Sequence, residues 1–532
     1  MSQDNALLNY PYTSQRMPVL AQNVVATSQP LAAAAGLQMF AKGGNAMDAA
    51  LATAICLTVV EPCMNGIGGD AFAIVWDGKD LHGMNSSGRA PAAWSAEKFA
   101  GLDRMPAMGW DSVTTPGVVA GWRSAWEKFG SLPFEALFEP AIRYAREGFI
   151  VSPTVHRQWQ SQIETLKDQP GFADAFIRNG AAPQAGERFI CPGQAETLEQ
   201  IAATKGDAFY KGELADAIVA HAQNTGGVIT KEDLAAHKTD WADPIRVQYR
   251  DVELCEIGPN GQGIGALMAL GILDNFDMSG MQPDSPEVVH LQIEAMKLAF
   301  ADLREHIADP DFMKVESKQL LHKDYLAKRA ALIDPRRASV ARAGDPHTGG
   351  TVYLTAADKN GMMVSFIQSN FKGFGSGVVV PNTGIALQNR GWGFSTQAGH
   401  PNVVGPNKRP FHTIIPGFVM KNGKPLMSFG VMGGAMQAQG HLQVTSRVAD
   451  FGFNAQAASD APRWRVKDDN SSIAVEWNFP AETVEALRAM GHDVEVAPRL
   501  DLEFGSAQIA MRRDDGYAAA SDHRKDGLAI GY

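Results

Sequence analysis

The chain has 532 residues, of which 45% are hydrophobic and 20% charged, and these proportions exclude a disordered or fibrous protein. Its net charge of -11 argues against a binder of nucleic acid or of an anionic membrane, because both partners need a basic surface. A small molecule is therefore the expected partner. The length allows three or four domains, or one large consolidated unit.

The N-terminal residues and the cysteines bear on the compartment. Residues 1–20 have no basic start followed by an apolar run, which predicts no secretory signal and a cytoplasmic protein. The longest apolar stretch, residues 49–60, is too short to span a bilayer and predicts a buried core helix. The cysteines lack metal-ligand spacing, so we expect free thiols, no metal and no cofactor. They are Cys56, Cys63, Cys191 and Cys255.

The first half of the chain predicts alternating strands and helices. Residues 23–27 indicate a strand that leads into an Ala-rich helix. A glycine-rich turn then feeds a strand with a hairpin at Asp77-Gly78. Gly66, Gly68 and Gly69 do not complete a dinucleotide fingerprint and precede a strand, so we expect them to serve close packing.

The middle of the chain predicts mostly helices. Residues 89–149 indicate loops and helices, and residues 153–321 are expected to be largely helical, with an amphipathic helix at 288–304. Residues 336–350, rich in Arg, Ala, Asp and Gly, predict a mobile loop. After this loop the pattern changes to alternating polarity and tight turns, which predicts antiparallel hairpins.

The stretch DPHTGGTVYLTAADKNG, residues 345–361, joins that loop to the first hairpin. Thr351 follows two glycines and opens a strand. A threonine hydroxyl needs an adjacent base, and a free α-amino group on the same residue, titrating near neutral pH, can serve. That chemistry requires cleavage of the Gly350–Thr351 bond. Taken alone, the stretch also fits a Gly-Gly hinge before an exposed strand.

Several blocks resemble the γ-glutamyltranspeptidase family, whose proenzymes cut themselves before a threonine. The resemblance implies an N-terminal-nucleophile hydrolase of the α+β class, a four-layer αββα sandwich with two antiparallel sheets between helical layers. It also implies a large subunit, 1–350, and a small subunit, 351–532, interwoven in one domain. The blocks, in family order, are GGNAMDAALATAICLTVVEP, GIGGDAFAIV, TTPGVVAGW, AIRYAREGFIV, GGTVYLTAADKNGMMVSFIQS, VGPNKRPFHTIIP, GVMGGAMQ and SDHRKDGLAIGY.

The resemblance also implies roles for single residues. Thr351 matches the nucleophile, and Ser369 stands where the family has a Thr that hydrogen-bonds it. Gly433 and Gly434 match the pair whose N–H groups form the oxyanion hole. His412 and Thr413 fall where two serines bind the α-carboxylate of the substrate.

Other positions depart from the family pattern. Phe371 replaces an Asn, Arg390 a Gln or Asn, and Gly393 the Asp that holds the α-ammonium group of a γ-glutamyl substrate. Ser87 replaces the carboxylate-binding Arg, although Arg89 lies two residues on. The loop between residues 394 and 405 is too short for the lid of long-looped members. We therefore expect a changed specificity with the same nucleophile.

The expected substrate is the amide of a small carboxylic acid without an α-amino group. Arg390, Arg89, His412 and Thr413 are predicted to receive its carboxylate, because an Arg binds carboxylates through two parallel hydrogen bonds. Cytoplasmic family members of purine catabolism hydrolyse oxamate to oxalate and ammonia, and oxamate is the leading candidate. The alternatives are a γ-glutamyl hydrolase or transpeptidase, a glutaryl- or cephalosporin-type acylase, and an inactive binding homologue. Association of the processed heterodimer into a homo-oligomer stays open.

Overall fold

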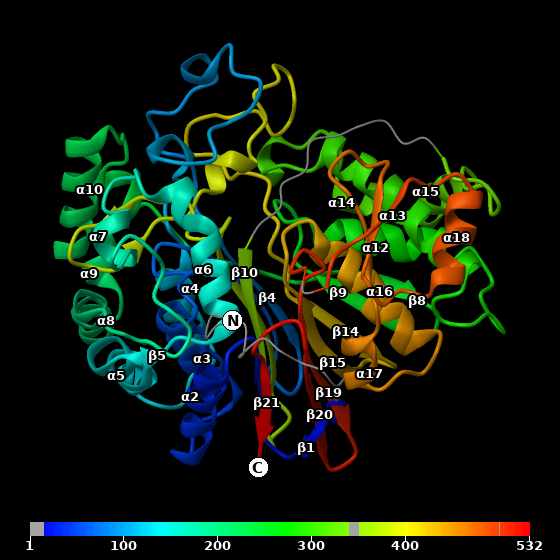
Figure 1. Cartoon of the computed structure of the whole chain (residues 1–532), viewed down its shortest axis with the longest axis horizontal. Coiled ribbons are helices and arrows are strands. Elements are labelled where there is room, and N and C mark those ends of the chain that lie inside the picture. Colours follow the sequence, from blue (N-terminus) through cyan, green and yellow to red (C-terminus); the bar gives the residue numbers. More distant parts are fainter. Residues whose placement is uncertain (1–14, 340–349, 500) are drawn as a thin grey trace.

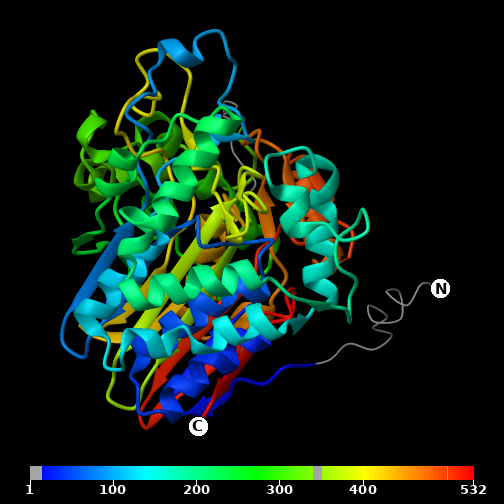
Figure 2. The same cartoon turned by 90° about the vertical axis from the view of Figure 1, so that its left-hand side faces the viewer.

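A computed structural model of the chain describes residues 15–339, 350–499 and 501–532. Two seven-stranded antiparallel sheets face each other at the centre, and helices cover the outer face of each (Figure 1 and, turned by 90°, Figure 2). This arrangement is the predicted αββα sandwich of the α+β class.

The first sheet has the strand order β21-β2-β10-β11-β3-β4-β7. Its two central strands, β10 and β11, follow Gly350 directly and are buried along both faces, as the predicted hairpin requires. The strands are β2 (Val24–Thr27), β3 (Asp70–Trp76), β4 (Leu81–Ser86), β7 (Asp240–Ala242), β10 (Gly350–Ala357), β11 (Met363–Phe371) and β21 (Leu528–Gly531).

The second sheet has the order β1-β20-β19-β15-β14-β9-β8. Its strands are β1 (Val19–Ala21), β8 (Ile245–Tyr249), β9 (Val252–Glu256), β14 (Gly417–Lys421), β15 (Lys424–Val431), β19 (Ala507–Arg513) and β20 (Gly516–Ser521). The prediction that 153–321 is largely helical is wrong over 240–256, which forms β7, β8 and β9. Residues 245–249 alternate between greater and lesser burial, and Arg250, at φ 52°, turns the chain into β9.

Helices from the first half of the chain cover the first sheet. They are α2 (Pro30–Ala41), α3 (Ala46–Val60), α4 (Val118–Phe129), α5 (Glu139–Glu147), α6 (Pro153–Leu166), α7 (Phe172–Phe176), α8 (Pro192–Thr204), α9 (Asp207–Tyr210), α10 (Glu213–Thr225) and α11 (Lys231–Ala235). Every residue of α3 is buried, and Asn45 and Asp48 form a capping box at its start. The predicted core helix is therefore confirmed.

Helices of the second half cover the second sheet. They are α12 (Gly263–Leu273), α13 (Pro286–His306), α14 (Ser317–Leu320), α15 (Lys323–Ala330), α16 (Met436–Ala449), α17 (Ala455–Asp460) and α18 (Ala481–Ala489). The predicted amphipathic helix at 288–304 is α13. Its polar residues are largely buried as well, because α16, α18 and the strand β16 (Trp464–Val466) pack on it.

Short elements complete the chain. The short strands are β5 (Phe149–Ile150), β6 (Arg188–Phe189), β12 (Val379–Val380), β13 (Ile385–Ala386), β16 (Trp464–Val466), β17 (Ile473–Val475) and β18 (Val494–Val496). The 3-10 helices are η1 (Glu97–Phe99), η2 (Trp110–Ser112), η3 (Phe134–Leu137), η4 (Pro310–Phe312) and η5 (Arg390–Gly393). Within the described ranges, no helix is long and apolar enough to cross a membrane.

Both sheets contain strands from before and after Gly350. The β10–β11 hairpin lies between β2 and β3, and the core between the sheets joins residues of both parts, such as Phe72, Tyr353 and Phe418. The hydrophobic core is therefore shared between the two parts, while their separation into subunits stays a prediction. The predicted loop at 336–350 falls mostly on residues 340–349, which lie outside the described residues. The four cysteines are free thiols, as expected.

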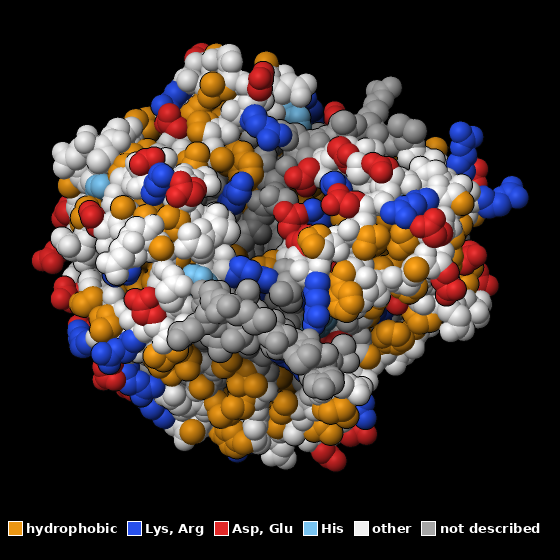
Figure 3. All heavy atoms as spheres, in the orientation of Figure 1, with side chains coloured by type: hydrophobic (Ala, Val, Ile, Leu, Met, Phe, Trp, Pro, Cys, Tyr) orange, Lys and Arg blue, Asp and Glu red, His pale blue; other side chains and the backbone are white. Residues whose placement is uncertain are grey.

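The surface carries charges of both signs. Figure 3 shows acidic, basic and hydrophobic side chains interspersed on one face, with several acidic groups together at the right-hand edge of a central hollow.

Candidate active site

Thr351 lies beside a β-bulge at the start of β10. Gly350 pairs with Phe371 and Val352 with Gln368, so β11 carries one extra residue opposite Thr351. Phe371 has φ 81°, a left-handed conformation that costs a bulky residue about 1–3 kcal/mol. The Phe371 N–H donates to Ser369 Oγ at 2.7 Å, which helps to hold this conformation. The bulge thus places the Ser369 hydroxyl beside Gly350.

Hydroxyl groups surround the carbonyl of Gly350. Ser369 Oγ donates to Gly350 O at 2.6 Å, and Thr351 Oγ1 lies 2.7 Å from the same oxygen. The two hydroxyl oxygens are 3.4 Å apart. Thr351 is only 2% exposed, so its hydroxyl is shielded from competing water. The predicted nucleophile, its neighbouring hydroxyl and the predicted scissile bond are brought together.

Gln437 is a site residue that the sequence analysis missed. Its Nε2 donates to Thr351 Oγ1 at 3.2 Å, and its Oε1 accepts from Ile415 N–H at 2.9 Å. The second bond fixes which end of the amide faces Thr351. The available signal was its place in the GVMGGAMQ block, in the first turn of α16 after the paired glycines.

Gly433 and Gly434 form the turn between β15 and α16. Both have positive φ, 114° and 60°, a conformation that glycine adopts at least cost. Among the described residues, their N–H groups have no hydrogen-bond acceptor. Gly433 lines the same cavity as Thr351. The pair therefore meets the requirement of an oxyanion hole for free backbone donors beside the nucleophile.

Arg390 is completely buried behind Phe371. Its Nη1 donates to Thr413 Oγ1 at 2.9 Å, and its Cζ lies 4.5 Å from the Phe371 ring centroid. Nε and Nη2 are buried without a hydrogen-bond partner among the described residues. Burial lowers the pKa of Arg390 to about 9, and the nearby Asp70 carboxylate opposes this shift. Arg390 is therefore a cation at neutral pH that lacks most of its hydrogen bonds.

Asp70 is the acidic group nearest to this cation along the sheet. Its carboxylate accepts from Gly88 N–H at 3.2 Å and from Gly117 N–H at 3.0 Å. Burial raises the pKa of Asp70 to about 7, against the lowering effect of Arg390 and of these bonds. Asp70 therefore changes charge near neutral pH.

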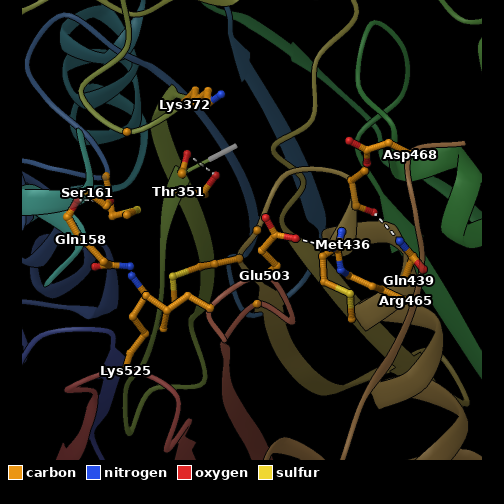
Figure 4. A pocket seen from close by; sticks show the side chains of 18 of the residues that line it. Gln158, Ser161, Thr351, Lys372, Met436, Gln439, Arg465, Asp468, Glu503 and Lys525 are labelled. Carbon is orange, nitrogen blue, oxygen red and sulfur yellow. Dashed lines mark hydrogen bonds and ion pairs between the residues drawn. The ribbon is translucent and has the colours of Figure 1, made fainter. Parts of the chain in front are cut away.

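Two adjoining cavities open at the site. One of about 270 Å³ is lined by Gly350, Thr351 and Gly433. In Figure 4, Thr351 stands at the start of β10, with Arg465, Asp468 and Glu503 across the cavity from it. The other cavity, about 630 Å³, is lined by Gly393 and Thr413. Ala435, next to the paired glycines, lines both.

Comparison with known proteins identifies the family. The family described as Gamma-glutamyltranspeptidase matches residues 32–532. The chain belongs to this family. It is accordingly an enzyme, a hydrolase of amide bonds with the N-terminal-nucleophile fold.

Several relatives cover nearly the whole chain. The "Glutathione hydrolase-like YwrD proenzyme" of Bacillus subtilis is 37% identical over 96% of this chain and 98% of the relative. The "Oxamate amidohydrolase proenzyme" of Klebsiella pneumoniae is 36% identical over 94% and 97%. A crystal structure of cephalosporin acylase from Bacillus halodurans has 46% identity and a TM-score of 0.94, over 99% and 98%. The family includes more than one named activity, so membership leaves the substrate undetermined.

The predicted substrate role of His412 is not supported. Its Nε2 lies 3.2 Å from Asp70 Oδ2, and its Nδ1 accepts from Ile414 N–H at 3.3 Å. Burial and the nearby Arg390 hold the pKa of His412 well below its usual value, so the ring is neutral. Both ring nitrogens are therefore used within the protein.

Arg89, also predicted to bind substrate, is likewise engaged by other groups of the protein. Its guanidinium pairs with Asp309 at 2.9 Å and donates to Asn407 O at 3.0 Å. Arg89 lines neither of the two cavities. A nearly buried carboxylate, that of Asp309, has drawn this side chain away from the site.

Gly393 is explained by packing. A Cβ added there would lie 2.6 Å from Phe411 O, so an Asp does not fit on this backbone. Gly66, Gly68 and Gly69 likewise pack against neighbouring chain, as expected for close packing.

One buried group of side chains has potential metal ligands, namely His290, Glu294 and His492. His290 Nδ1 and His492 Nε2 share a hydrogen bond of 2.8 Å, and Glu294 pairs with Lys297 Nζ at 2.9 Å. Glu294 also accepts from Ser339. These ligand atoms are committed to one another and to neighbouring groups. The absence of a metal and a cofactor stays a prediction.

Proposed function

We propose that this chain is an autoprocessing N-terminal-threonine amidohydrolase that acts on the amide of a carboxylic acid lacking an α-ammonium group. The observation that carries the proposal is the cluster of Thr351 Oγ1, Ser369 Oγ and Gln437 Nε2 around the Gly350 carbonyl. Cleavage there gives subunits 1–350 and 351–532, in agreement with relatives named proenzymes.

Autocleavage begins with attack of Thr351 Oγ1 on the carbonyl carbon of Gly350. The C–O bond forms, the C–N bond to Thr351 breaks, and the nitrogen takes a proton to become a free α-amino group. Ser369 polarises the carbonyl through its 2.6 Å hydrogen bond. Water then hydrolyses the ester, leaving a carboxylate on Gly350 and the hydroxyl on Thr351.

Substrate hydrolysis repeats the same chemistry on an external amide. The α-amino group of Thr351, whose ordinary pKa is about 8, accepts the hydroxyl proton and passes it to the leaving amine. The free N–H groups of Gly433 and Gly434 stabilise the tetrahedral oxyanion. Water releases the acyl group from Thr351 in the second step.

We expect the acid group of the substrate to bind beside Arg390, which lines neither cavity itself but donates to Thr413, a residue that does. This buried cation has two unpartnered nitrogens and shares a hydrogen bond with Thr413, which lines a cavity. A carboxylate would satisfy a guanidinium that now lacks hydrogen bonds. Gly393 provides no anion for an ammonium group. These features favour oxamate or a related acid amide over a γ-glutamyl compound.

A longer carboxylic acyl group is a second candidate. The 630 Å³ cavity beside Thr413 favours it, since oxamate is a two-carbon acid. The named activity of the 46% identical cephalosporin acylase is also compatible with a larger acyl group.

Thr351→Ala tests the reaction class. Intact-mass analysis of the wild type should give two subunits cut at Gly350–Thr351, and the variant should stay one chain. Its amide hydrolysis should fall by at least about 1000-fold, as expected for loss of a nucleophile. Thr351→Ser, which keeps the hydroxyl, should cleave slowly. A wild type that stays one chain and is nevertheless active would contradict the mechanism.

Substrate choice is tested by ammonia release from oxamate beside p-nitroaniline release from γ-glutamyl- and glutaryl-p-nitroanilide. Preference for the γ-glutamyl compound would overturn the acid-amide proposal. Cleaved protein that hydrolyses none of the three would support an inactive binding homologue.

A further inference from the structure

The larger cavity is lined by Arg304 and by the exposed Arg104, and the chemistry at Thr351 uses neither cation. Arg304, in the last turn of α13, lines this cavity, and its Nη1 is buried without a hydrogen-bond partner. Its Cζ lies 5.7 Å from the Phe300 ring centroid. This half-buried guanidinium thus has a buried donor, Nη1, that no described residue satisfies.

The walls around Arg304 combine this charge with apolar surface. Phe300, Phe394 and Phe411 line the cavity, while the acidic side chains of Asp103 and Glu305 are exposed. Burial lowers the pKa of Arg304 to about 10, with Asp468 and Asp469 opposing the shift, so it stays a cation at neutral pH. Walls that combine aromatic side chains, polar groups and a half-buried cation suit an amphipathic acid.

The loop that closes this cavity is fixed to the scaffold. His400 Nε2 lies 2.9 Å from Arg304 O, and Asn402 Nδ2 donates to Gly393 O at 2.7 Å. Asn402 Oδ1 accepts from Phe411 N–H at 3.0 Å. These bonds connect the loop to α13, to η5 and to the segment before Thr413. The cavity wall therefore has a defined shape.

The cavity adjoins the reacting centre. Gln262 lines it and donates through Nε2 to Gly434 O at 2.8 Å and to Thr413 O. Ala435 lines both this cavity and that of Thr351. An acyl group bound to Thr351 beside the oxyanion glycines can therefore extend past Ala435 and Thr413 toward Arg304.

We propose that this cavity is a subsite for the far end of the acyl group, in which Arg304 binds a terminal carboxylate and Phe300, Phe394 and Phe411 contact an apolar spacer. The inference rests on the proposed amidohydrolase function and specifies its substrate class as monoamides of dicarboxylic acids with a spacer of about six carbons or more. A volume of 630 Å³ equals that of about twenty water molecules. Oxamate or a glutaryl group fills only a small part of such a space.

Binding of product acids tests the subsite without requiring turnover. Calorimetry on the cleaved wild type should give affinities that rise from oxalate through glutarate and adipate to suberate. Arg304→Gln should weaken suberate binding about tenfold or more and oxalate binding less than twofold, because only the long acid reaches residue 304. Arg123→Gln, which removes an exposed arginine paired with Glu127 and Asp207, is the matched control and should change neither.

A second variant distinguishes loss of binding from a folding defect caused by the substitution of Arg304. Ala301→Trp fills the cavity from α13 without removing a charge and should also weaken suberate binding selectively. Autocleavage and the melting temperature of each variant report the fold. Affinities that do not depend on chain length, or equal losses for suberate and oxalate, would overturn the subsite.

Hydrolysis of glutaryl-, adipyl- and suberyl-p-nitroanilide separates this inference from the function on which it rests. A rise in kcat/KM with length that Arg304→Gln abolishes supports both. If kcat/KM depends neither on the length of the acyl group nor on residue 304, the subsite proposal alone is overturned. Selective suberate binding without hydrolysis of any amide supports the subsite and contradicts the amidohydrolase.

Discussion

Two buried clusters of Asp and Arg have opposite electrostatic properties. In the site cluster, Asp70, Arg390 and His412, Arg390 makes a single side-chain hydrogen bond among the described residues, and the pKa of Asp70 is raised to about 7. In the C-terminal cluster, Asp522, Glu476, Arg463 and Arg524, Asp522 accepts from both arginines, and its pKa is held well below its usual value.

The number of hydrogen bonds explains the difference. Arg524 contacts Glu476 through Nε at 2.7 Å and Nη2 at 2.5 Å, and Asp522 also accepts from Ala507 N–H at 2.7 Å. Attraction exceeds desolvation at Asp522, Glu476 and Arg524, although burial still lowers the pKa of Arg463 to about 10. Burial dominates at Asp70 and Arg390.

In the C-terminal cluster every charged group belongs to an ion pair, so the cluster is complete in charge pairs and serves the fold, although Arg463 Nε has no hydrogen-bond partner among the described residues. In the site cluster, Arg390 forms no ion pair with a described residue, and a substrate carboxylate can supply one.

Removing one partner of the complete cluster should have the largest effect on stability. Asp522→Ala leaves Arg463 and Arg524 with uncompensated buried charge, and we expect a loss of about 3–5 kcal/mol in the free energy of unfolding. Urea denaturation of the cleaved protein measures this loss, with Asp515→Ala in the exposed turn before β20 as control. A loss below about 1 kcal/mol would remove the distinction between the clusters.

The site cluster should respond in substrate affinity instead. Arg390→Ala removes a charge that has few partners, so the free energy of unfolding should change by less than about 1 kcal/mol. KM for oxamate, whose carboxylate lies next to its amide, should rise about 10- to 100-fold, the range for loss of a charged hydrogen bond. Arg390→Lys should be intermediate, since it keeps the charge without the planar fork.

Both Arg390 variants should still cut at Gly350–Thr351, because the scissile bond does not depend on the carboxylate site. An Arg390→Ala chain that unfolds as readily as Asp522→Ala would assign the residue to the scaffold.

The smallest effect, and the sharpest contrast, is expected in pH dependence. The depressed pKa values of Asp522 and Glu476 contribute stability above about pH 4 that is lost as pH falls through their folded values. The raised pKa of Asp70 has the opposite sign: its contribution is complete below about pH 4 and is lost as pH rises through about 7.

The pH dependence of the free energy of unfolding, measured from pH 3 to 9, should therefore differ between two variants. Asp522→Asn should reduce the change in the free energy of unfolding at acid pH. Asp70→Asn should reduce the change near neutral pH. KM for an acid amide should rise severalfold through pH 7 in the wild type, because ionised Asp70 competes for Arg390. The same KM profile in Asp70→Asn would contradict this assignment.

Much of this protein followed from local patterns. The buried helix α3, the hairpin after Gly350 and the position of Thr351 each rest on neighbouring residues, namely an apolar run, a tight turn and two glycines. The strands at 240–256 were missed because a segment with helices on both sides was interpreted as helical. Their alternating polarity was the available signal.

The site was only partly predictable, because its geometry depends on long-range contacts. Gln437 reaches Thr351 across 86 positions, and His412 reaches Asp70 across 342. Nothing in the sequence distinguishes Arg89 from Arg390 as a candidate for binding a carboxylate. The guanidinium of Arg89 pairs with Asp309, which lies 220 positions away in the chain. The guanidinium of Arg390 is instead buried against Phe371.

The sequence by itself determined the family and the layered fold and predicted the nucleophile, because ordered motifs carry that information. Only the tertiary structure decided which charged groups are free to meet a substrate. A guanidinium is available when its fixed neighbours leave its donors unsatisfied, and those neighbours come from segments that are distant in the chain.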